Sequence, residues 1–117
     1  MQILARLEKA TDRIWGEFCE IYPILIRHNP PDILLNSRYK RTIASCTPTE
    51  NKIEMAARYL ANNPVLMYNE ILPHEIAHQI HYILEGEAAW LGQKNHGKQW
   101  QKIMLDYGAE PKRTYQI

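Results

Sequence analysis

Apolar residues recur at steps of three and four positions across residues 3–21, and the positions between them are largely charged. An apolar stripe with this period is typical of an amphipathic helix that packs one face on a core. Pro23 follows the stripe and predicts its end, because proline has no backbone N–H to continue the helical hydrogen bonds. The stripe consists of Ile3, Leu4, Leu7, Ile14, Trp15, Phe18 and Ile21.

The next part of the chain predicts short strands. Residues 24–27 (Ile-Leu-Ile-Arg) predict one strand, and residues 29–32, which contain two consecutive prolines, predict the loop after it. Residues 41–46 and 52–56 flank a turn-forming segment, and apolar and charged positions alternate in the second run. This pattern predicts a hairpin with one buried face.

A long helix is predicted from Asn63 onward. Asn63 is placed to cap it, and Pro64 suits the first helical position, where the backbone N–H has no helical partner. The helical period continues to about Leu84. Pro73 falls inside this run and predicts a kink or the start of a second segment.

The C-terminal part predicts a loop and one more helix. Residues 85–95 contain two glycines and predict the loop, whereas residues 96–107 again carry apolar residues at helical spacing. Gly108 is placed to end this helix, because glycine readily adopts the left-handed conformation that often follows a helix C-terminus. The order helix, short strands, long helix, loop, helix predicts an α+β domain with a small, mainly antiparallel sheet.

Composition and charge agree with this fold class and narrow the function classes. The 117 residues predict one domain, residues 1–117, with 45% hydrophobic and 23% charged residues, an ordinary globular balance. A formal net charge of +1 does not by itself demand a nucleic acid or a membrane as partner. Two cysteines are too few for a disulfide scaffold or a four-cysteine zinc site.

The N-terminal segment and the overall hydropathy bear on location. Charges at Arg6, Glu8 and Lys9 leave no apolar signal-peptide core, and no apolar run approaches the length of a membrane span. We therefore expect a cytoplasmic protein, free or associated with the nucleoid or DNA, that has no membrane partner and is a monomer.

The sequence His74-Glu75-Ile76-Ala77-His78 is an H-E-x-x-H motif within the predicted long helix. Residues four apart lie on one helical face, so the imidazoles of His74 and His78 can bind one catalytic zinc ion at about 2.0–2.1 Å. Glu75 projects beside the metal, where its carboxylate can take a proton from zinc-bound water. The alternative reading is two surface histidines that flank an ordinary glutamate.

A catalytic zinc usually has three protein ligands and one open position, so a third ligand is expected. His96 is well placed, because a glycine-containing loop can return the start of the last helix to the metal; its alternative is a surface or capping role. Glu85 and Glu87 follow the motif too closely to fold back easily, and Glu110 lies past the predicted helix end. His81 lies about 10 Å along the helix from the first motif histidine, too far to share the metal with both, and is expected to line the cleft wall.

These residues resemble the SprT-like metallopeptidase domain of the SprT/Spartan family, in order and with compatible spacing from about Arg38 onward. The resemblance implies a minimal zincin-like fold, with one catalytic zinc held by His74, His78 and His96 and with Glu75 as the catalytic residue. It also implies peptide-bond hydrolysis near DNA. The similar segments are residues 41–46 (Arg-Thr-Ile-Ala-Ser-Cys), 73–78 (Pro-His-Glu-Ile-Ala-His), 96–100 (His-Gly-Lys-Gln-Trp) and 111–116 (Pro-Lys-Arg-Thr-Tyr-Gln).

Two features depart from the family's pattern. Bacterial relatives often continue into a C-terminal zinc ribbon, whereas this sequence stops at Ile117. The expected organisation is a single domain without the ribbon, so either any DNA contact comes from the domain itself or the ribbon is missing from this sequence. Tyr115 stands where relatives are expected to have histidine.

Further candidates lie outside the metal ligands. Arg113 and Tyr115 are candidates for stabilising the oxyanion or contacting substrate if the C-terminal tail folds over the cleft; the alternative is a solvated tail. Trp100 is predicted to be a core residue. Cys46 is predicted to be a small buried residue rather than a deformylase-type metal ligand.

Basic residues fall in two groups that are candidates for contact with nucleic-acid phosphates. Part of the second group recurs every four residues and can form a stripe on the last helix. The alternative is ordinary solvated surface. The first group is Arg38, Lys40 and Arg41, and the second is Lys94, Lys98, Lys102, Lys112 and Arg113.

Taken together, these patterns predict a zinc-dependent endopeptidase that acts on protein substrates, with DNA-associated or DNA-crosslinked proteins as candidates. Its predicted mechanism is attack by zinc-bound water with Glu75 as the general base. One alternative is a catalytically weak, zinc-stabilised module that binds DNA or protein. Another is a different zinc hydrolase, such as an amidase or a deformylase.

Overall fold

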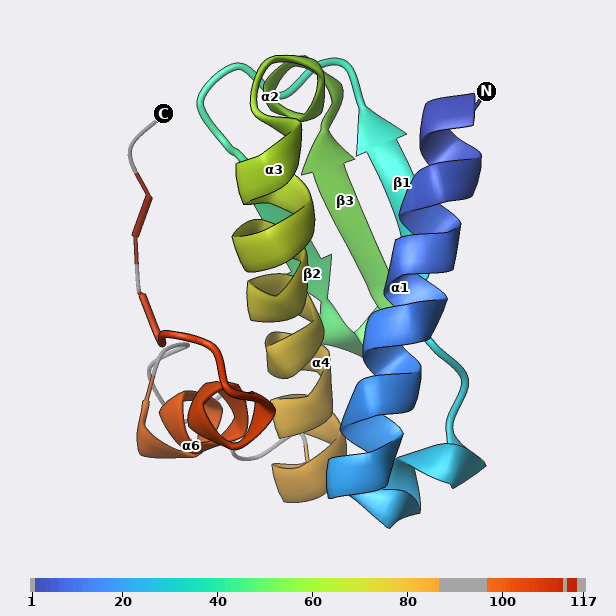
Figure 1. Ribbon diagram of the computed structural model, residues 1–117, viewed down its shortest axis with the longest axis vertical. Coiled ribbons are helices and arrows are strands. Elements are labelled where there is room, and N and C mark those ends of the chain that lie inside the picture. Colours follow the sequence, from blue (N-terminus) through green and yellow to red (C-terminus); the bar gives the residue numbers. More distant parts are fainter. Residues whose placement is uncertain (1, 87–96, 113, 116–117) are drawn as a thin grey trace.

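The computed structural model describes residues 2–86, 97–112, 114 and 115, and in it helices α1 and α4 lie over one face of a three-stranded sheet (Figure 1). Helix α6 packs against both of these helices. The architecture is α+β, as predicted, and is consistent with a minimal zincin-like domain. The elements are α1 (Gln2–Ile21), η1 (Pro23–Arg27), β1 (Asp32–Asn36), β2 (Ala44–Thr47), η2 (Pro48–Glu50), β3 (Lys52–Ala56), α2 (Ala57–Asn62), α3 (Pro64–Leu66), η3 (Met67–Ile71), α4 (Leu72–Glu85) and α6 (Lys98–Tyr107).

The sheet has the strand order β1-β3-β2. One of its two strand pairs is antiparallel and the other is parallel. β2 and β3 are antiparallel, with Cys46 opposite Ile53, which confirms the predicted hairpin. β1 is parallel to β3, with Ile33 opposite the same Ile53. The sheet is therefore mixed rather than mainly antiparallel. β1 was not predicted, because its three consecutive apolar residues lack the polar alternation that marks a half-buried strand.

Helix α1 confirms the predicted amphipathic helix, and its apolar stripe faces the sheet and α4. Its buried residues are Leu7, Thr11, Ile14, Trp15 and Phe18. Thr11 is accommodated on this apolar face because its hydroxyl donates to the Leu7 carbonyl oxygen, at 2.8 Å. The core that these residues form with α4 and β3 sets the position of the motif helix.

The strand predicted at residues 24–27 is wrong, because this segment forms the 3-10 turn η1 instead. Pro23 opens the turn, and backbone bonds from Leu25 N–H to the Tyr22 carbonyl and from His28 N–H to the Leu25 carbonyl close it. Leu25 is fully buried, whereas Ile24 and Ile26 are 54% and 74% exposed. Apolar residues alone thus gave a misleading signal, since two of the three face solvent.

The long helix predicted from Pro64 onward is present as α3, η3 and α4 in succession (Figure 1). Asn63 occupies the cap position but makes no side-chain cap hydrogen bond. The predicted irregularity near Pro73 is a π-helical turn, η3, which lies directly before α4. Pro73 is the second residue of α4. Proline lacks an N–H for the carbonyl four residues earlier and crowds it, and a wider turn accommodates both effects.

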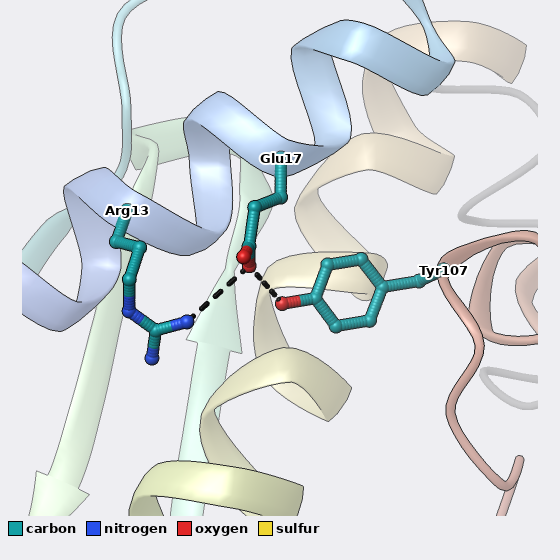
Figure 2. Close-up of polar contacts among 3 residues, drawn as sticks. All are labelled: Arg13, Glu17 and Tyr107. Carbon is teal, nitrogen blue, oxygen red and sulfur yellow. Dashed lines mark hydrogen bonds and ion pairs between the residues drawn. The ribbon is translucent and has the colours of Figure 1, made fainter.

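Helix α6 ends at Gly108, which adopts a left-handed conformation with φ of 91°, as predicted. Its last residue, Tyr107, anchors it to α1 (Figure 2). The Tyr107 hydroxyl donates to the Glu17 carboxylate, which also accepts from Arg13 at 3.4 Å. The Tyr107 ring stacks on Phe18, with ring centroids 4.3 Å apart.

A second contact between the same two helices lies close by. The Tyr22 hydroxyl donates to the Asp106 carboxylate, and Lys102 Nζ lies 2.7 Å from the same group. The Lys102 ammonium also lies over the Tyr22 ring, 5.9 Å from its centroid. Together with the stacked rings, these contacts fix α6 against α1, and α6 in turn carries a wall of the site described below.

Within the residues that the structure describes, no helix is long and apolar enough to cross a membrane.

Candidate metal centre

Helix α4 brings His74, Glu75 and His78 together on one buried face. The Nε2 atoms of the two histidines are 3.3 Å apart, and Glu75 Oε2 lies 3.7 Å from His74 Nε2. The ligand atoms of all three residues lie within 4.8 Å of one another. All three side chains are buried, with residue exposures of 5%, 8% and 5%. The predicted helical face is therefore confirmed.

The spacing of the two imidazole nitrogens fits a metal ion. Two nitrogens bound to one tetrahedral zinc at about 2.0–2.1 Å are separated by about 3.3 Å. The Nε2 atoms of His74 and His78 have this separation. A neutral imidazole pair with its Nε2 atoms turned toward each other is the arrangement expected of two ligands of one ion. The chemistry of the residues thus fits a metal site, and His74 and His78 would hold the ion.

Glu75 lies beside this pair and is buried away from solvent. Burial raises the pKa of its carboxyl to about 8, because desolvation disfavours the charged form. A divalent cation held by the neighbouring histidines would favour the carboxylate and lower this pKa again. In its carboxylate form Glu75 can accept a proton and later return it, which is the property a general base needs.

Trp100 forms a wall of the site. Its ring stacks on His78 with centroids 5.2 Å apart and meets His74 edge-on at 4.7 Å. Its indole Nε1–H donates to the His74 backbone carbonyl at 3.2 Å. Trp100 is fully buried, so the predicted core role is correct, but the residue also orients both motif histidines. Sequence reasoning missed this second role, since nothing in the helical spacing of α6 shows which residues it contacts.

Replacing Trp100 with phenylalanine is expected to weaken zinc binding by about 10-fold or more, as losses of partners that orient metal ligands typically do. The variant keeps an aromatic ring but loses the bond to the His74 carbonyl, and the unfolding free energy should fall by about 1–2 kcal/mol. Competition with a chelator measures the affinity, and urea denaturation measures the stability.

The matched control is Trp15→Phe in α1, because Trp15 is also buried, at 4% exposure. Its ring makes no contact with either motif histidine among the described residues. This control should lose stability without losing zinc affinity. Equal zinc affinities for the two variants would contradict the orienting role of Trp100.

Gln79 connects the motif helix to the sheet. It is buried, its Nε2 donates to the Pro48 carbonyl at 3.2 Å, and its Oε1 accepts from the Cys46 thiol at 3.7 Å. Burial and the nearby Glu75 carboxylate raise the pKa of Cys46, so this thiol stays protonated. Cys46 is half-buried and stands outside the His-Glu-His group among the described residues. Sequence reasoning missed Gln79, although it lies one helical turn after Glu75.

The C-terminal tail returns to the site after α6. The Tyr115 ring meets the His74 ring edge-on, with centroids 5.6 Å apart. Burial, together with the charges of Glu70, Glu75 and Glu110, raises the pKa of Tyr115 to about 12, so the phenol is protonated at neutral pH. The tail at Tyr115 is therefore not merely solvated but contacts His74, whereas its role in stabilising an oxyanion or contacting substrate stays a prediction.

Three predicted site residues, the third ligand His96 together with Lys94 and Arg113, lie outside the described residues. His81 is buried, at 2% exposure, and does not belong to the His-Glu-His group among the described residues. Burial lowers the pKa of His81, because desolvation disfavours the charged imidazolium.

The first basic group lies at one end of the long axis of the molecule. Arg38, Lys40 and Arg41 are exposed in the connection between β1 and β2. The Lys40 carbonyl accepts a bond of 2.9 Å from the Tyr59 hydroxyl of α2, which places this connection at the α2 end in Figure 1. Among the described residues, no acidic side chain pairs with these three cations.

The described members of the second group lie on α6 and in the segment after it, and α6 is toward the other end of the molecule (Figure 1). Lys98 and Lys102 are exposed, but Lys102 pairs with Asp106, at 2.7 Å. Lys112 pairs with Glu70, at 3.5 Å. Among the described residues the two predicted groups therefore lie apart, and part of the charge in the second is neutralised locally.

Comparisons with known proteins bear on the same residues. A family model described as the SprT-like family matches residues 15–116. Protein SprT of Actinobacillus succinogenes is 38% identical over 66 residues, a match that covers 56% of this chain and 36% of that relative. The chain therefore matches only about a third of the length of this relative. No solved structure gives a significant match.

Proposed function

This chain belongs to the SprT-like family, and on that premise we propose that it is a zinc-dependent endopeptidase. Its substrates would be proteins, including DNA-associated or DNA-crosslinked ones. The observation that carries the proposal is the buried group in which the His74 and His78 Nε2 atoms lie 3.3 Å apart with Glu75 beside them. Two imidazoles at ligand spacing with a buried carboxyl beside them support metal-assisted hydrolysis rather than a purely structural site.

A bound zinc ion would polarise the peptide carbonyl and increase the acidity of the attacking water. The chain's own residues would transfer the proton and position the metal ligands. Glu75 accepts one proton from the water as its oxygen adds to the carbonyl carbon, and later passes that proton to the leaving amine nitrogen as the C–N bond breaks. Trp100 holds the imidazole of His78 in place by stacking and excludes water from one side of the site.

The sheet offers a way to hold an extended substrate. β2 is an outer strand, since β3 pairs with it on one side and the order is β1-β3-β2. Cys46 on this strand contacts Gln79, one turn along α4 from Glu75. A peptide that paired with the outer edge of β2 would therefore run beside the motif helix, and main-chain hydrogen bonds would position it with little dependence on sequence.

The proposal includes contact with DNA through the first basic group. Arg38, Lys40 and Arg41 are exposed and lack acidic partners among the described residues, so they are able to meet phosphates. The alternative function is a zinc-stabilised module that binds DNA or protein without cleaving it. The same exposed cations would serve that binding function. Protein cleavage therefore distinguishes the endopeptidase from the binding module.

The proposed function predicts metal-dependent cleavage of a flexible protein such as casein. Zinc-loaded protein should cleave it, removal of zinc by a chelator should reduce the rate at least about 100-fold, and added zinc should restore it. The assay is run with and without single-stranded DNA, and bound zinc is quantified in parallel. Zinc at one ion per chain without cleavage under either condition would favour the binding module and contradict the proposal.

A further inference from the structure

We propose that Tyr115 is a catalytic residue whose hydroxyl donates a hydrogen bond to the oxyanion formed from the substrate carbonyl. This inference rests on the proposed function and adds a group to it that the H-E-x-x-H motif does not contain. The residue comes from the C-terminal tail, forty positions after Glu75, and the fold brings it against His74, the neighbour of Glu75.

The tail is held in place over the site by several contacts. After α6, the left-handed Gly108 and a bond of 2.9 Å from Ala109 N–H to the Met104 carbonyl reverse the chain direction. Lys112 then forms an ion pair of 3.5 Å with Glu70 on η3, the turn that leads into the motif helix. The tail thus runs back toward the start of α4, where the first motif histidine lies.

Tyr115 lies at the end of this path. Its ring meets the His74 ring at an interplanar angle of 70° with centroids 5.6 Å apart, and Lys112 Nζ lies 5.9 Å from the centre of the Tyr115 ring. The ring is half-buried, so it has one side against the site and one side toward solvent. The Tyr115 ring therefore lies directly beside one of the two histidines that would hold the metal.

The hydrogen-bond donors at the site favour Tyr115 for this role. Trp100 also contacts His74, but its indole N–H already donates to the His74 carbonyl. The Tyr115 hydroxyl forms no hydrogen bond among the described residues, which leaves its donor available to a ligand. Donors held ready for the charge that develops in the transition state are a main source of rate acceleration in acyl transfer.

Hydrolysis by this route needs no reactant besides water and the peptide. As the water oxygen bonds to the carbonyl carbon, Glu75 takes the water proton and the C=O π electrons move to the oxygen, which becomes the oxyanion. Tyr115 donates a hydrogen bond to this oxygen and keeps its own proton. When the C=O bond re-forms, the C–N bond breaks and Glu75 returns the proton to the amine nitrogen.

The test is Tyr115→Phe, which removes the hydroxyl and keeps the ring against His74. We expect kcat to fall by about 100-fold with KM changed by less than about 2-fold, because an oxyanion donor acts mainly in the transition state. Binding of a phosphinic peptide, which imitates the tetrahedral oxyanion, should weaken by a similar factor. Zinc affinity, measured by chelator competition, should stay within about 2-fold of wild type, since the hydroxyl is not a ligand.

Tyr39→Phe is the matched control, because Tyr39 bonds to Ser45 and Glu54 and contacts none of the motif residues. It should leave kcat and phosphinic-peptide binding unchanged. Tyr115→Ala provides a second variant that also removes the ring. Wild-type kcat and phosphinic-peptide affinity in Tyr115→Phe would overturn the inference, whether or not Tyr115→Ala is impaired, because the residue would then act at most as a cover. If wild-type protein with zinc cleaved no substrate, the proposed function would fail as well, and the two failures are thereby distinguished.

Discussion

Replacing Glu75 with glutamine is expected to lower the rate of protein cleavage by about 1,000-fold while zinc stays bound. Glutamine has nearly the same shape as glutamate but cannot accept the water proton at neutral pH. The buried position of Glu75 strengthens the expectation, because no other described carboxylate joins the group of ligand atoms within 4.8 Å. Rates of casein cleavage and the zinc content of each preparation measure the two parts of this result.

The control for this substitution is Glu85→Gln, at the exposed end of the same helix. It removes one carboxylate from α4 without touching the buried group, and it should cleave at the wild-type rate. A Glu75→Gln protein that still digested casein at a comparable rate would show that the proton is taken by another group, and the assigned mechanism would be wrong.

Replacing His78 with alanine is expected to weaken zinc binding by more than about 100-fold and to abolish cleavage, since a ligand is lost outright. Alanine also removes the ring on which Trp100 stacks, 5.2 Å away, so the wall of the site loses its support. Zinc content after dialysis against a weak chelator and the cleavage rate are the measurements. The thermal stabilisation that zinc gives the wild-type protein should be absent from the variant as well.

His28→Ala is the matched control for the ligand substitution, because His28 is an exposed residue after η1. It should retain full zinc and full activity. If His78→Ala retained zinc with wild-type affinity, the metal would have to be held elsewhere, and the pairing of His74 with His78 as ligands would be refuted.

The part of the site that could be predicted from the sequence is the part encoded by local spacing. A helix places residues four apart on one face, so His74, His78 and the adjacent Glu75 had to come together once the helix formed. The helix itself was predictable from its apolar period and from Pro64 at its start. The hairpin of β2 and β3 was predictable for the same kind of reason, because alternation and a turn segment are neighbours in sequence.

The features of the fold and the site that could not be predicted depend on contacts between segments distant in sequence. The periodicity of apolar residues does not encode such contacts. β1 pairs in parallel with a strand that is not its neighbour in the chain, and its short apolar run could equally belong to a loop. The roles of Trp100 and Gln79 follow from where α6 and η2 pack on α4. Tyr115 was a candidate only if the tail folded back, and the contacts that accompany its return, such as the ion pair between Lys112 and Glu70, join segments far apart in the sequence. His96 as the third ligand stays a prediction.

The π-helical turn η3 has a consequence for how this protein can vary. A π turn contains one residue more than the α-helical path it replaces, and each residue rotates the following helix by about 100°. Met67 and Ile71 in the turn and Ile76 in α4 are all buried together, so the turn sets the rotational phase of α4 relative to α3. Deletion of one residue between Met67 and Ile71 would restore a regular helix but turn the histidine face away from Trp100 and Tyr115. Sequence length in this short stretch is therefore under tighter constraint than sequence identity, and insertions or deletions there would be more damaging than substitutions.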